Sequence, residues 1–144
     1  MPMIHTRQSL ATEFNRLNKL PYPLSADDLM FGTPIVFLQG LCNTQIQLTV
    51  KPTSINYKGT KTVFYNRRRL DDLLFGLKVP GRATDYPTTR EVVAKLQSFY
   101  GLPIDPDDIT GVPVVPDSPT VALQPRGDCV GFFTQYQAVL AYMD

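Results

Sequence analysis

The sequence contains few of the residues on which enzymatic and metal-binding sites most often depend. It has no tryptophan, a single histidine, His5, and two cysteines, Cys42 and Cys129, which are far apart and form no CxxC pair. A structural zinc ion needs about four such ligands at local spacing, so a zinc site is excluded. Catalysis by a Ser-His-Asp or Cys-His set would have to use His5. We expect the cysteines to be two buried thiols, with a long-range disulfide as the alternative.

Other absences narrow the function further. No GxGxxG, GxxxxGKT or HExxH pattern supports a nucleotide-binding loop or a zinc protease, although converging carboxylates remain open. No apolar run approaches the roughly 18–20 residues of a membrane span, and the first residues do not resemble a signal peptide. The 14 basic and 13 acidic residues balance, whereas nucleic-acid binders carry a basic excess. These patterns predict a soluble intracellular protein that is not an enzyme, has no cofactor or metal, and has neither a membrane nor nucleic acid as a partner.

Proline, in contrast, is abundant. The chain has 13 prolines in 144 residues, and six of them lie between Pro103 and Pro125. Such a stretch runs extended and contains no long helix. Aliphatic residues alternate with these prolines, so we expect residues 103–125 to form a stiff, ordered arm. The total length and the 43% hydrophobic content fit one domain with a substantial core.

Two segments have the periodicity of amphipathic helices. Leu10, Phe14 and Leu17 form one apolar stripe over residues 6–20, which end at a proline. This stripe packs either on the chain's own sheet or on a neighbouring subunit, so residues 1–24 are considered separately from an α+β domain over residues 25–144. The second helix is predicted over residues 89–100, with Thr88 and Glu91 as a capping box before it and a terminating glycine after it.

Strand patterns occupy much of the remaining sequence. Residues 45–50 and 60–65 alternate with a two-residue period and predict a hairpin. A buried strand is expected at residues 35–38, and two more strands at residues 120–123 and 132–143. In the last segment Phe132, Tyr136 and Leu140 would share one face. The expected fold is α+β, a single domain of mainly antiparallel sheet or sandwich with two amphipathic helices.

A short phrase occurs twice, as ADDLMFGTPIV in residues 26–36 and as PDDITGVPVV in residues 106–115. Each copy follows a predicted helix and precedes strand residues, which suggests that one helix–turn–strand unit is used twice. Neither copy has the alternating oxygen ligands and closing glutamate of a calcium loop. We interpret the aspartates as helix caps, with Ser25 capping the first copy and Asp105 the second.

The most concentrated charge lies at Arg67, Arg68 and Arg69, next to Tyr65. Basic and aromatic residues together could hold a phosphate backbone, but Asp71 and Asp72 follow and offset most of the field. Pairing with nearby carboxylates is the favoured interpretation. The residues considered as an assembly interface come from the first helix, this arginine cluster and the proline arm. They are Leu10, Phe14, Leu17, Arg67, Arg68, Arg69, Pro113 and Pro116.

Four short motifs carry a resemblance over roughly residues 25–125. They are Asn43 with Thr44, the segment YNRRRL at residues 65–70, YGL at residues 100–102, and Asp108 with Ile109. Together they resemble small virion structural proteins of large tailed bacteriophages. The resemblance implies a non-enzymatic subunit of the tail, neck or capsid-attached parts that assembles symmetrically with copies of itself and other virion proteins, made in the host cytoplasm and located in the virion. The alternative is a phage-encoded module that binds a host protein during infection.

Overall fold

The computed structural model describes residues 6–37 and 40–144. It confirms a single α+β domain with antiparallel sheets. Three helices, three 3₁₀ turns and six strands make up this part of the chain. In order they are α1 (Arg7–Asn18), η1 (Ala26–Asp28), β1 (Leu29–Phe31), β2 (Ile35–Val36), β3 (Thr44–Val50), β4 (Thr60–Tyr65), α2 (Leu70–Leu73), η2 (Ala83–Asp85), α3 (Thr89–Tyr100), η3 (Pro106–Asp108), β5 (Thr120–Leu123) and β6 (Ala138–Ala141).

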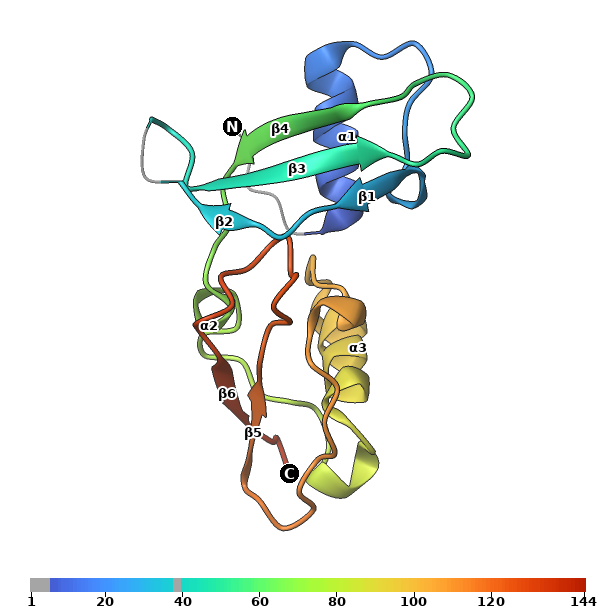
Figure 1. Ribbon diagram of the computed structural model, residues 1–144. Coiled ribbons are helices and arrows are strands. Elements are labelled where there is room, and N and C mark those ends of the chain that lie inside the picture. The colour runs from blue at the N-terminus through green and yellow to red at the C-terminus, as the bar shows by residue number, and fades with distance from the viewer. Residues whose placement is uncertain (1–5, 38–39) are drawn as a thin grey trace.

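The N-terminal lobe consists of α1 and a four-stranded antiparallel sheet (Figure 1). Strand β3 lies in the middle, pairing with β4 along one edge and with β1 and then β2 along the other. Helix α1 covers one face of this sheet, where Leu10 and Ala11 pack against Ile46, Leu48 and Val63. The alternative in which the first helix packs on the chain's own sheet is therefore the one that the structure shows.

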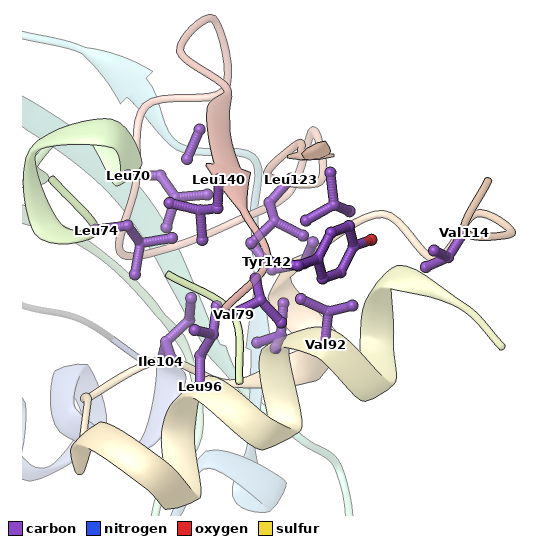
Figure 2. Packing of buried hydrophobic residues seen from close by; sticks show 14 of the residues in the cluster. Leu70, Leu74, Val79, Val92, Leu96, Ile104, Val114, Leu123, Leu140 and Tyr142 are labelled. Carbon is purple, nitrogen blue, oxygen red and sulfur yellow. The ribbon is translucent and has the colours of Figure 1, made fainter. Parts of the chain in front are cut away.

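The C-terminal lobe packs α2 and α3 against the antiparallel β5–β6 pair and the proline-rich segment (Figure 2). Val92, Leu96 and other residues of α3 face a larger apolar cluster. Ile104, Ile109 and Val114 of the proline-rich segment are buried in the same cluster. The prolines thus hold an extended segment against the core, and apolar side chains spaced five residues apart attach it there.

Two chain segments join the lobes. Tyr65, at the end of β4, is fully buried and its hydroxyl donates a hydrogen bond of 2.8 Å to the Val130 carbonyl. A short parallel bridge pairs Arg68 with Phe132, and Val130 belongs to the apolar cluster of the N-terminal lobe. The chain therefore returns from the C-terminal lobe to complete the first core, which makes the two lobes one domain.

The repeated phrase corresponds to a repeated local structure. Helices α1 and α3 each span 12 residues, begin at a threonine cap and end at a left-handed residue, Lys19 or Gly101. In each case a 3₁₀ turn follows and then an extended segment. The helix and turn of the expected unit are thus present in both lobes, but only the first copy continues into a strand, β1. The second copy continues into an extended segment with isolated bridges at Ile109 and Pro113.

Several predicted boundaries are confirmed, and two predicted strands are wrong. The helix at residues 89–100 and the strands at 60–65 and 120–123 have the predicted extents. The strand predicted at residues 132–143 is reduced to β6, because Phe133 and Tyr136 leave the alternation to cover the side chains of Arg67 and Arg69. The strand expected to be buried at residues 35–38 is instead the half-exposed β2, a sheet edge that no helix covers; Leu38 lies outside the described residues.

We expect Thr88→Ala to lower the free energy of unfolding by about 1 kcal/mol. The Thr88 hydroxyl caps the first turn of α3, and the Glu91 carboxylate accepts a hydrogen bond of 3.1 Å from the Thr88 amide. Urea denaturation followed by circular dichroism measures the change. Thr84→Ala, at an exposed position before the helix, serves as the control and should differ from wild type by less than half as much.

Candidate functional site

The face of the N-terminal sheet opposite α1 carries no charged side chain among the described residues. Because strand side chains alternate between faces, the burial of Ile46, Leu48 and Val63 under α1 places their neighbours on the other side. We call this surface the outer sheet face. Its members are Met30, Ile35, Gln45, Gln47, Thr49, Thr60, Thr62 and Phe64.

Apolar side chains lie at both ends of the outer sheet face. Ile35 and Phe64 flank Gln45 in one cross-strand row, and the Phe64 ring contacts Phe37 with a centroid separation of 4.8 Å. Met30 lies at the other end of the face, beside Thr49. All three large apolar side chains of the face are about half exposed. A hollow of about 210 Å³ lies among Gly32, Thr33, Ile35, Gln45, Ile46, Gln47 and Thr62.

Two loops at the ends of the sheet extend this apolar character. Leu41, before β3, is 96% exposed, and Ile55, between β3 and β4, is 95% exposed. Exposed apolar side chains that gather on one part of a domain mark sites of interaction. The outer sheet face with these two loops is therefore the candidate functional site of the N-terminal lobe.

The arginine cluster has a structural role at its first position. Arg67 is only 5% exposed, and its Nε donates a hydrogen bond of 2.9 Å to the Thr44 hydroxyl. Its guanidinium lies 4.6 Å from the centre of the Phe133 ring. Burial lowers the pKa of the Arg67 guanidinium. Arg67 as a direct contact to a neighbouring subunit is therefore wrong, since the core encloses its side chain.

Arg69 pairs with a nearby carboxylate, as was predicted for the arginine cluster. Its guanidinium makes two hydrogen bonds to the Asp71 carboxylate, at 3.0 and 2.8 Å, and lies over the Tyr136 ring. The hydrogen bond from Arg69 lowers the pKa of Asp71. Arg68 joins the lobes through its backbone, which accepts from Phe133 and donates to Gly131.

The remaining residues of the expected interface divide by burial. Leu10 is 1% exposed within the first core, so its direct role in an interface is also wrong. Phe14 is partly buried against the same core, while Leu17 on α1 remains 49% exposed. Pro113 and Pro116 are exposed on the proline-rich segment. For Leu17, Pro113 and Pro116 an interface role stays a prediction.

A polar cleft of about 480 Å³ separates the lobes at the place where the two repeated phrases meet. Ala26 and Asp27 line it from the first copy, and Asp105, Asp107 and Asp108 line it from the second. Asp105 caps η3 as predicted, since its carboxylate accepts a hydrogen bond of 2.9 Å from the Asp107 amide. In the first copy the Asp28 carboxylate accepts from the Ser25 amide and hydroxyl.

Asp108 departs from the capping interpretation. Its side chain is buried, and its Oδ2 has no hydrogen-bond partner in the described part of the chain. Burial and, to a smaller extent, the nearby Asp105 carboxylate raise the pKa of Asp108 to about 6, although Arg7 acts against both. Arg7 itself binds Asp128 at 3.1 Å across the lobe junction. The carboxyl group of Asp108 thus titrates in a position where charge is poorly compensated.

The other candidate residues give no site of their own. Cys129 is buried, Cys42 is partly exposed, and both are free thiols; burial raises the pKa of the Cys129 thiol to about 11. His5 lies outside the described residues. Within residues 6–37 and 40–144 no group of three or more histidine, cysteine or acidic side chains is placed to hold a metal ion. None of the helices described there has the length and apolar character needed to cross a membrane.

The outer sheet face was not predicted from the sequence, although a signal for it is present there. Strands β3 and β4 together contain one charged residue, Lys61, and its Nζ donates a hydrogen bond of 2.8 Å to Asn18 of α1. The polar half of each alternation is glutamine and threonine, where an exposed face normally includes lysine and glutamate. A polar strand face made of glutamine and threonine, without lysine or glutamate, is therefore the sequence pattern that marks the outer sheet face.

Comparison with known proteins assigns the chain to a family. Residues 2–141 match a family of unknown function, DUF7941, and the chain belongs to that family. No curated protein and no solved structure matches it.

Proposed function

We propose that this protein is a non-enzymatic structural subunit of a tailed-phage virion, which binds neighbouring virion proteins through its outer sheet face. The observation that carries the proposal is the absence of charge from this face within the described residues, together with its exposed Met30, Ile35 and Phe64 side chains. The resemblance of the YNRRRL and YGL segments to small phage virion proteins supports the setting in a particle.

The chemistry of the face suits a protein partner. The centres of protein interfaces are depleted in charged residues and combine apolar contacts with hydrogen bonds. Gln45, Gln47 and Thr62 offer donors and acceptors around the hollow, while Ile35 and Phe64 supply apolar area. A neighbour can bury this surface without desolvating a charge, which would be costly.

We expect Gln47→Glu to reduce incorporation of the protein into phage particles by at least tenfold. The substitution places one carboxylate at the centre of the outer sheet face, where docking would bury it without a cationic partner. Quantitative mass spectrometry of purified particles, made with each variant supplied in place of the wild-type protein, measures the copy number. Gln135→Glu, at an exposed position in the C-terminal lobe, is the matched control and should be incorporated normally.

Two results would contradict the proposal. Absence of the wild-type protein from purified particles would overturn the virion role and favour the host-binding alternative. Equal incorporation of both variants would leave a virion protein whose contacts lie elsewhere than the outer sheet face.

A further inference from the structure

The outer edge of β4 is free of backbone pairing in the described chain. Strand β4 pairs only with β3. The hydrogen bond from the Val50 amide to the Gly59 carbonyl fixes which residues of β4 face β3, since bonded positions alternate along an antiparallel ladder. The backbone groups of Thr60, Thr62 and Phe64 therefore point away from β3. We call these three residues the outward residues of β4.

The bonds on the far side of β3 support this assignment. The Gln47 carbonyl accepts a hydrogen bond of 2.9 Å from Gly32, and the Lys51 amide donates one of 2.9 Å to Asp28. Odd-numbered residues of this part of β3 thus bond toward β1, which leaves the even-numbered ones to bond β4. With the observed register, those partners are the residues of β4 that alternate with the outward ones.

This edge lacks the features that usually prevent pairing with another chain. Edge strands are commonly protected by outward lysines, prolines, bulges or very short length. Strand β4 spans six residues without proline, and its one charged side chain, Lys61, is held against α1 by Asn18 and lies 5.9 Å from the centre of the Phe14 ring. In contrast, β1 and β2 on the opposite edge have only three and two residues.

The outward residues of β4 can also pair with the same three residues of a second copy of the chain. If an identical β4 runs antiparallel across a two-fold axis through Thr62, Thr62 lies opposite its own copy and Thr60 lies opposite Phe64. These are the positions whose amides and carbonyls are free on both strands, so the ladder is complete in this register. Each Lys61 then lies opposite Val63, and no like charges face each other directly.

We propose that two copies of the chain form a symmetric dimer by antiparallel pairing of β4 with β4. The dimer joins the two N-terminal sheets into one and places both outer sheet faces on the same side. This inference rests on the proposed function as an assembly subunit, and it adds the partner, a second copy, and the register. A two-fold interface of this kind uses the same surface on both subunits.

Site-directed cross-linking tests the register. In a Cys42→Ser background, oxidation of Thr62→Cys should convert most of the protein into a disulfide-linked dimer. Opposed residues at bonded positions have Cα atoms about 5.5 Å apart, within the range that a disulfide bridges. The matched control, Thr60→Cys, should stay monomeric on a reducing-agent-free gel, because its two copies would be roughly 14 Å apart along the strands. Mixing Thr60→Cys with Phe64→Cys should restore the cross-link.

Sedimentation equilibrium without cross-linking provides the second measurement. Thr62→Pro removes only an outward amide, which edge strands tolerate, and we expect it to raise the dimer dissociation constant at least tenfold. Thr62→Val keeps the amide and should dimerise like wild type. Circular dichroism of each variant confirms that the sheet is retained.

Two outcomes would overturn the inference. A wild-type protein that stays monomeric up to high concentration, or an oligomer that is indifferent to Thr62→Pro and cross-links equally at Thr60→Cys, would exclude β4 pairing. The virion role is measured separately by particle incorporation, so a monomer that still enters particles would refute the dimer alone. A dimer that is absent from particles would refute the virion role alone.

Discussion

Asp108→Asn is expected to remove a pH-dependent loss of stability that amounts to about 1.4 kcal/mol between pH 5 and pH 8 in the wild-type protein. Burial raises the pKa of Asp108 in the folded state from its ordinary value of 3.8 to about 6. The folded protein therefore binds a proton that the unfolded chain has released over this range. Stability rises as the pH falls through 6 and levels off near 4, at about 1.4 kcal/mol for each unit of pKa shift.

Urea denaturation at pH 8, 7, 6 and 5 measures this profile. The wild-type free energy of unfolding should increase toward pH 5, whereas that of Asp108→Asn should change much less. Asp27→Asn removes an exposed carboxylate from the same cleft and should follow the wild-type profile. Parallel profiles for wild type and Asp108→Asn would mean that the carboxyl group is hydrated or paired in solution, contrary to its environment in the structure.

Phe132→Ala should lower the free energy of unfolding by about 3–5 kcal/mol, the range for removing a fully buried phenylalanine. The Phe132 side chain has no exposed surface and lies in the core of the C-terminal lobe. Its backbone also pairs with Arg68 in the bridge between the lobes. Truncation therefore leaves a cavity at the point where the two lobes depend on each other.

The same denaturation experiment, with Phe75→Ala as its control, distinguishes burial from the general loss of an aromatic residue. Phe75 is 87% exposed, so its replacement should change stability by less than about 0.5 kcal/mol. If the two substitutions had similar effects, Phe132 would not be in the core. If Phe132→Ala is too unstable to purify, Phe132→Leu preserves most of the side-chain volume and should show a smaller loss.

The parts of the fold that could be predicted from sequence are those governed by local rules. Helix α3 has a capping box at one end and a left-handed glycine at the other, so both boundaries are encoded within a few residues. Strand β4 alternates cleanly and has its predicted bounds. The prediction failed for residues 132–137, where alternation was present but contacts with Arg67 and Arg69 determine the conformation. Such distant contacts leave no periodic signal in the segment itself.

The candidate site was only partly accessible to the same reasoning. Leu10 and Arg67 were expected at an interface because amphipathic stripes and charge clusters commonly lie at surfaces, yet both are buried. The environment of Asp108 could not be predicted, because the burial of one aspartate in DD depends on how the second lobe meets Arg7 of the first. The outer sheet face needed the strand pairing, which shows that Gln45, Gln47 and their neighbours form one surface.

The return of the chain from the C-terminal lobe to the first core has a consequence for the order of folding during synthesis. Tyr65 completes its hydrogen bond only with Val130, 65 residues later, and Val130 is itself part of the first apolar cluster. A ribosome would release β3, β4 and α1 well before that segment emerges, so the nascent first half would wait with an incomplete core and a free strand edge. Contacts so distant along the chain slow folding and prolong the exposure of such edges. The first half expressed alone should therefore aggregate, and the complete chain should acquire protease resistance in both halves at the same time.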